Sequence, residues 1–161
     1  MERRCKPSWI EAYLEYTNDQ ESPKAFHFWV AVSILSAVLQ RKVWISRVKY
    51  TIYPNLYVIL IAGSAKCRKS VAIRIGMDVL KSMKAPPTIF AQKITTEALI
   101  QALEESKDKN KMCYGIIVAS ELSVFLGSDA IKSGIIPALT DLYDSTSKWQ
   151  YHTRARGREE L

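Results

Sequence analysis

The sequence predicts an α/β fold with a mostly parallel sheet and helices on both faces. From residue 56 onward, apolar segments of strand length alternate with segments of helical periodicity, as they do in βαβ units. The chain has 161 residues and is 48% hydrophobic, enough for a sizeable core. We expect an N-terminal cap over 1–55 and a nucleotide-binding core over 56–161, together forming one compact unit.

The cap is expected to contain two helices and a hairpin. Ser8 and Glu11 have the spacing of a capping box. Pro23 suits the first turn of a second, strongly apolar helix. The expected elements are a helix after Ser8, a polar turn at 18–22, a helix from Pro23 to Leu39, and short strands at 43–45 and 48–52.

The core is expected to alternate between strands and helices. Thr95 or Thr96 caps one helix, and Pro137 is expected to bend another. The expected elements are strand 56–62, helix 70–83, strand 88–94, a helix from 95 or 96 to about 106, strand 112–120, helix 131–143 and strand 149–153.

A phosphate-binding loop is the most informative motif. It lies between the expected strand 56–62 and helix 70–83, which is the context that a P-loop requires. Arg68 stands where the Walker A pattern has its second glycine, and left-handed backbone costs a non-glycine residue about 1–2 kcal/mol. The alternative is an ordinary basic turn between a strand and a helix. The candidate nucleotide-binding residues are Gly63, Ser64, Ala65, Lys66, Cys67, Arg68, Lys69 and Ser70.

A second candidate site ends the apolar strand 112–120. In a parallel sheet, the carboxyl end of a strand beside the P-loop faces the nucleotide, where a carboxylate orients water or organises Mg²⁺. Glu121 is the candidate for the water, and Lys69 and Glu121 are the candidate catalytic residues. Ser70 and Ser120 are the candidate residues at the metal, although Ser120 stands where an aspartate is usual. The alternative for Glu121 is a solvated residue that begins the next segment.

Composition narrows the choice of compartment and partner. The net charge of +7 favours polyanions, with nucleic acid first. Three cysteines without paired spacing argue against a disulfide framework or zinc site. The start has no apolar signal region, and the stretch Phe26–Leu39 is too short to cross a membrane. We therefore expect a cytoplasmic protein without a membrane partner.

For several other polar residues we expect structural roles. Thr95 and Thr96 are expected to cap a helix, Asp141 and Asp144 to lie on the surface, and His27 to be packed in its apolar helix. Cys67 would make the loop sensitive to oxidants. The stretch from Trp149 to Arg158, with His152, fits either a nucleic-acid contact or an exposed hairpin.

The order of these motifs resembles P-loop NTPase domains of phage, prophage and plasmid replication proteins, which are RecA-like, helicase-like modules often joined to a primase. The resemblance covers most of the chain. Its motifs are Tyr53-Pro54-Asn55-Leu56-Tyr57, Arg68-Lys69-Ser70, Ser120-Glu121-Leu122, Leu139 to Asp144, Trp149 to Thr153, and Gly157.

The resemblance implies an ATPase that binds ATP and Mg²⁺, with Lys69 and Ser70 on the phosphates and metal and Glu121 in the Walker B place. It implies DNA, single-stranded or duplex, as a partner, with a primase or another replication protein as a further one. Homo-oligomerisation is compatible with it. Such domains continue into a sensor and an arginine finger, so an incomplete RecA-like core is expected here.

Two rival functions stay open beside the ATPase. The chain fits a degenerate P-loop module that binds DNA or a partner protein, in which Arg68 and Ser120 mark lost hydrolysis. A small-molecule kinase shares the loop, but no arginine-rich lid follows the Walker B segment, so this function ranks last.

Overall fold

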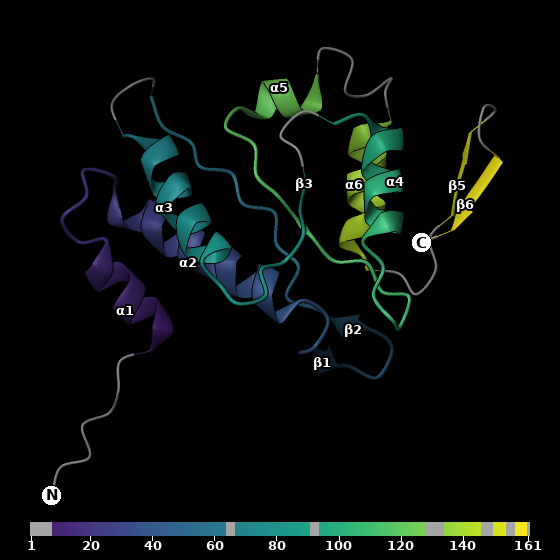
Figure 1. Ribbon diagram of the computed structural model, residues 1–161, viewed down its shortest axis with the longest axis horizontal. Helices are drawn as coiled ribbons and strands as arrows, with labels where there is room; N and C mark the ends of the chain where they lie inside the picture. Colours follow the sequence, from purple (N-terminus) through teal and green to yellow (C-terminus); the bar gives the residue numbers. More distant parts are fainter. Residues whose placement is uncertain are drawn as a thin grey trace, which may run out of the picture. The chain divides into compact units, whose positions relative to one another are not determined.

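The computed structural model describes residues 8–63, 67–90, 94–127, 134–145, 150–153 and 157–160. These residues form an α/β structure, as predicted (Figure 1). Within them the helices are α1 (Trp9–Tyr16), α2 (Lys24–Leu39), α3 (Lys69–Lys81), α4 (Thr96–Glu105), α5 (Leu122–Leu126) and α6 (Ile135–Tyr143), and the strands are β1 (Ile45–Ser46), β2 (Thr51–Ile52), β3 (Ile89–Phe90), β4 (Ile116–Ile117), β5 (Gln150–Thr153) and β6 (Gly157–Glu160).

The chain divides into two units, which we describe separately. The first unit comprises Met1–Leu39 and Leu56–Pro86, and the second comprises Gln40–Asn55 and Pro87–Leu161. The predicted cap and core, by contrast, are each one continuous segment with the boundary at residue 55. That division stays a prediction. None of the described helices is long and apolar enough to span a membrane.

The first unit begins with the predicted capping box. The Ser8 hydroxyl accepts a hydrogen bond from the Glu11 amide at 3.3 Å, and the Glu11 carboxylate accepts one from the Ser8 amide at 2.7 Å. These bonds satisfy amides that a helix start leaves open. They also hold the pKa of Glu11 below its usual value. The next helix, α2, begins directly after Pro23, as predicted.

Helices α2 and α3 pack closely, with a glycine of α3 facing apolar side chains of α2 (Figure 1). Ala72, Gly76 and Leu80 form the buried stripe of α3. A Cβ at Gly76 would overlap Val30 Cγ1 of α2 and lie 3.3 Å from Ile34 Cδ1. The absence of a side chain at Gly76 therefore allows the two helices to approach each other.

Residues 56–62 differ from the prediction, because the structure assigns no strand to them. Ile59 is 60% exposed and Ile61 is 83% exposed. A strand needs a hydrogen-bonded neighbour, and none of the described strands pairs with this segment. Apolar β-branched composition favours a strand without supplying that neighbour.

The second unit contains the parallel pair β3–β4. Ile89 pairs with Ile116 and Phe90 with Ile117. Phe90 is buried against Gly115, where a Cβ would overlap the aromatic ring. The predicted strands 88–94 and 112–120 are thus present in part, although residues 91–93 lie outside the described ranges. This pair is a parallel sheet of two strands. The larger, mostly parallel sheet covered on both faces stays a prediction.

Of two helices in the second unit, α4 begins as predicted and α6 begins later than expected. Thr95 caps α4, since its hydroxyl accepts a bond from the Ala98 amide at 3.2 Å. Helix α6 begins at Ile135, whereas residues 131–133 of the predicted helix lie outside the described ranges. Pro137 therefore falls in the first turn, where its missing amide leaves no helix bond unmade. The predicted bend assumed that this proline lay in the helix interior.

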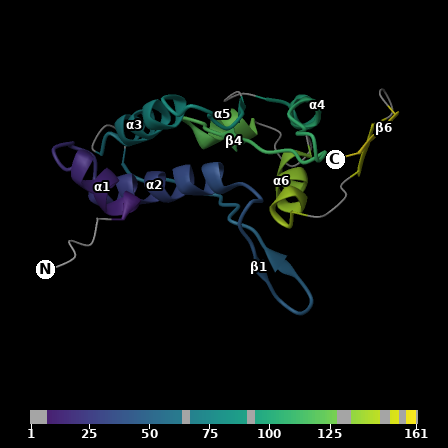
Figure 2. The same ribbon diagram turned by 60° about the horizontal axis from the view of Figure 1, so that its bottom comes forward.

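The hairpin β1–β2 is antiparallel, as predicted, and shorter than expected. Its base is tied to the end of α6 within the same unit (Figure 2). Arg41 donates to the Ser145 carbonyl at 3.0 Å, and its guanidinium lies 4.2 Å from the centre of the Tyr53 ring. Asn55 donates to the Tyr143 carbonyl. The hairpin is thus anchored at its base.

The last strands form the antiparallel pair β5–β6, in which Gln150 pairs with Glu160. Strand 149–153 was predicted and is confirmed over Gln150–Thr153, with residue 149 outside the described ranges. Its pairing with Gly157–Glu160 agrees with the hairpin that was one of the two alternatives for Trp149 to Arg158. The structure also contains the short helix α5 between β4 and α6, which the sequence pattern did not indicate.

Candidate functional site

The candidate phosphate loop ends in a left-handed residue at the start of α3. Arg68 has φ 40° and ψ 45° and occupies the N-cap position, so the helix begins at Lys69. This is the conformation that the missing glycine of the motif would adopt most easily. Left-handed backbone costs an arginine about 1–2 kcal/mol, so neighbouring contacts have to hold it.

Two residues of the α1–α2 turn contact Arg68. The Ser22 hydroxyl donates to the Arg68 carbonyl at 2.9 Å, and the Arg68 guanidinium forms an ion pair with Glu21. Ser22 is buried, whereas the ion pair is largely exposed and is therefore worth little. The hydrogen bond from Ser22 is the stronger restraint on the loop end. The pair with Glu21 offsets the positive charge that Arg68 would add beside an anion.

The ammonium of Lys69 bonds to the residue that precedes the loop. Its Nζ donates to the carbonyl oxygen of Ala62 at 2.8 Å, although the two residues are seven positions apart. Ala62 ends the apolar segment before the loop, so this bond joins the start of α3 to the residue just before the candidate motif. The lysine side chain is half-buried, which reduces the screening of its charge by water.

The start of α3 supplies the other groups that a phosphate would need. The first amides of a helix have no intrahelical partner, and the helix dipole favours an anion there. Ser70 is exposed in the first turn. Its hydroxyl fits Mg²⁺ as a single ligand only, with phosphates and waters supplying the rest. Within the described residues, no group of three His, Cys, Asp or Glu side chains could hold a metal ion.

The middle of the motif lies outside the described residues. Ser64, Ala65 and Lys66 are therefore not placed, whereas Gly63 and Cys67 border them. Cys67 is a free, half-buried thiol. The described part of the motif thus consists of its two ends, joined by Lys69.

Glu121 and Ser120 lie in the second unit, after β4. Glu121 is exposed and occupies the N-cap position of α5 without a side-chain capping bond. This position agrees with both interpretations from the sequence, a water-orienting carboxylate and a solvated residue that begins the next segment. Lys69 belongs to the first unit and Glu121 to the second.

The secondary candidates have structural roles where they are described. Thr95 caps α4, Asp144 is the C-cap of α6, and Asp141 is exposed, all as expected. His152 lies in β5, whose backbone alone is described. Cys5 lies outside the described residues. Among the thiols, Cys113 is half-buried, and burial raises its pKa.

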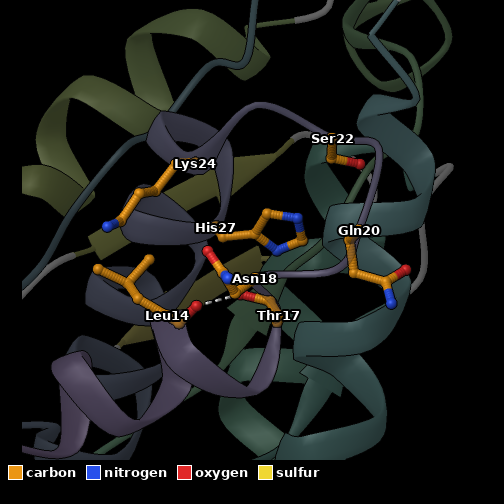
Figure 3. A pocket seen from close by; sticks show the side chains of 7 residues that line it. All are labelled: Leu14, Thr17, Asn18, Gln20, Ser22, Lys24 and His27. Atoms are coloured by element: carbon orange, nitrogen blue, oxygen red, sulfur yellow. Dashed lines mark hydrogen bonds between the residues drawn. The ribbon is translucent and has the colours of Figure 1, made fainter.

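A cavity of about 180 Å³ in the first unit was not predicted (Figure 3). His27 was expected to be packed in α2, and it is 2% exposed. The histidine also lines this cavity, and neither ring nitrogen has a hydrogen-bond partner among the described residues. The signal in the sequence was weak, because it consisted only of one histidine in an apolar helix that follows the polar turn 18–22.

Comparison with known proteins gives no relative that would assign the loop or the cavity: no protein-family model, no curated protein and no solved structure matches this chain.

Proposed function

We propose that this chain binds ATP with Mg²⁺ through residues 63–70. It would act as the ATPase module of a mobile-element DNA replication protein of the helicase or primase type, built on a P-loop core. One observation carries the proposal. Lys69 directly follows the left-handed N-cap residue Arg68, and its ammonium donates a 2.8 Å hydrogen bond to the Ala62 carbonyl, just before the loop.

The chemistry assigned to the loop is phosphate binding. An incoming triphosphate would replace the Ala62 carbonyl as the acceptor of the Lys69 hydrogen bond. The bond would become stronger, because phosphate oxygens are charged and the carbonyl oxygen is neutral. The amides at the start of α3 would bind further phosphate oxygens. Ser70 would contribute its hydroxyl to Mg²⁺, which lowers the charge repulsion at the phosphates when it is bound. Glu121 would orient the attacking water.

The nucleic-acid partner is assigned to the β1–β2 hairpin. No acidic residue occurs from 41 to 53. Lys42, Arg47 and Lys49 are exposed there, and so are the aromatic side chains of Trp44 and Tyr50. Cations that meet phosphates and rings that stack on bases are the two features of single-strand binding surfaces. A primase or another replication protein remains part of the proposal as a further partner.

The decisive experiment is calorimetric titration of the full chain with ATP and Mg²⁺. Lys69→Ala should abolish binding, because it removes the ammonium that bridges the two ends of the loop. Lys81→Ala is the matched control, since Lys81 is exposed in the last turn of the same helix. Unchanged affinity in Lys69→Ala would remove the assignment of the phosphate loop.

A degenerate binding module is the second candidate, and it is favoured by Arg68 in place of the motif's glycine and Ser120 in place of the usual aspartate. Phosphate release with and without single-stranded DNA separates the two functions. Turnover that DNA stimulates supports the ATPase. Salt-sensitive DNA binding without turnover supports the binding module.

A further inference from the structure

The cavity at the α1–α2 turn is lined mostly by polar side chains (Figure 3). Its wall comes from the end of α1, the turn and the first turns of α2. The lining residues are Leu14, Thr17, Asn18, Gln20, Ser22, Lys24 and His27. Thr17, Ser22 and His27 are buried, so the inner wall is fixed by packing.

His27 has unmet hydrogen-bonding capacity at this wall. Both ring nitrogens are buried and have no partner among the described residues. Burial lowers the pKa of His27, which favours the neutral ring. A neutral imidazole offers one donor and one acceptor. Because buried polar groups in native proteins are nearly always hydrogen-bonded, the ring requires a partner that the described protein atoms do not provide.

The chemistry of the wall distinguishes between ligands. Among the described residues that line it, Lys24 alone carries a fixed charge, and it is exposed, so the inner wall lacks the cations that phosphate recognition uses. The amides of Asn18 and Gln20 supply neutral donors and acceptors, and Leu14 supplies an apolar surface. A flat heterocycle with hydrogen-bonding edges fits these groups better than an anion.

The cavity adjoins the candidate phosphate loop through Ser22. This residue lines the cavity, and its hydroxyl donates to the Arg68 carbonyl at 2.9 Å. Arg68 directly precedes Lys69. The wall of the cavity is therefore one hydrogen bond away from the residue that begins the phosphate site, and both lie in the first unit.

We propose that this cavity receives the base of the nucleotide whose phosphates bind at Lys69, with His27 bonded to the edge of the base. The inference rests on the proposed function and adds the residues that would distinguish a nucleotide from bare phosphate. His27 acts here as a binding residue.

The test compares ATP with inorganic tripolyphosphate, which has the phosphates but no base. Both are titrated with Mg²⁺ into the full chain by calorimetry. His27→Ala should weaken ATP binding about tenfold, the value of one hydrogen bond to a buried partner, and leave tripolyphosphate binding unchanged. His152→Ala, at the chain's other histidine, is the matched control and should change neither affinity.

A second variant covers the case in which His27→Ala does not fold. Asn18 is exposed, so Asn18→Ala should keep the fold and still weaken ATP selectively. His27→Asn keeps a donor and an acceptor in the wall and should recover part of the ATP affinity.

The outcomes separate this inference from the proposed function. Equal affinity of wild type and both alanine variants for ATP would overturn the base site while leaving the phosphate loop intact. Parallel weakening of ATP and tripolyphosphate would also overturn it, because it would mean that His27 only supports the loop. Failure of wild type to bind either ligand would overturn the proposed function, and the base site with it.

Discussion

The hydroxyl of Ser22 donates a 2.9 Å hydrogen bond to the carbonyl of Arg68, 46 positions further along the chain. This bond connects the α1–α2 turn to the left-handed residue at the start of α3. It restrains the carbonyl just before Lys69 and therefore the direction in which α3 begins. The end of the loop is thus fixed from outside the motif itself.

Arg68→Gly should stabilise the protein by about 0.5–1 kcal/mol. Relief of the left-handed strain gains about 1–2 kcal/mol, and the flexibility of glycine in the unfolded chain offsets part of it. Loss of the ion pair with Glu21 changes little because both side chains are exposed. Urea denaturation measures the change.

Arg74→Gly is the control for this substitution. Arg74 is exposed in the interior of α3, where glycine costs about 1 kcal/mol. The two changes should thus have opposite signs. Similar losses of stability at both positions would show that residue 68 is not strained in solution.

Gly76→Ala should destabilise the protein by about 1–3 kcal/mol, because the new methyl group meets Val30 of α2. Gly63→Ala is the control, since a Cβ there has no neighbour within 4 Å. The double variant Val30→Ala/Gly76→Ala should lose less stability than the two single losses together, because the smaller residue 30 makes room. Additive losses would argue against this contact between α2 and α3.

The double substitution Arg47→Glu/Lys49→Glu should weaken binding of a labelled oligo-dT strand. Removal of each cation that meets a phosphate should reduce the slope of log affinity against log salt by about 0.7. Fluorescence anisotropy at several salt concentrations gives both values. Lys81→Glu/Lys84→Glu changes the net charge equally and should leave most of the affinity. Equal losses in both variants would indicate general charge attraction instead of a hairpin site.

Stability should fall as the pH decreases from 7 towards 5, and His27 should account for part of the loss. Burial lowers its pKa in the folded state, whereas the unfolded value is about 6.5. The unfolded chain therefore binds the proton more readily, and the contribution of His27 is complete only above about pH 6.5.

Urea midpoints at several pH values test this dependence. Below about pH 5 the bonded carboxylate of Glu11 also starts to lose its stabilising charge, so the comparison stays above that pH. His27→Gln should flatten the curve between pH 5 and 7. An unchanged slope in that variant would assign the dependence to other groups.

Local patterns predicted the helices well. The Ser8–Glu11 capping box, the proline before α2 and the threonine cap of α4 each lie within a few residues of the helix that they begin, so the sequence contains both partners of the interaction. Helix α5 was not predicted, because five residues are too few to establish a helical period. The left-handed geometry of Arg68 was foreseeable from its place in the motif.

Strand pairing and the cavity were not predictable in the same way. The apolar composition of residues 56–62 favours a strand, but a ladder depends on a neighbour that local sequence does not choose. The role of Ser22 at Arg68 likewise depends on a contact between residues 46 positions apart. His27 was correctly expected to be buried, but its missing partners emerged only from the packed structure.

The sequence by itself determined where α1, α2 and α4 begin, which residue carries the strain of the missing glycine, and which ammonium stands next to it. Only the tertiary structure decided that Lys69 reaches Ala62, that Ser22 holds Arg68, and that His27 faces a cavity. The physical reason is range. Helix caps are settled by bonds within a few residues, whereas these three arrangements depend on where the packing of the first unit brings separate segments together.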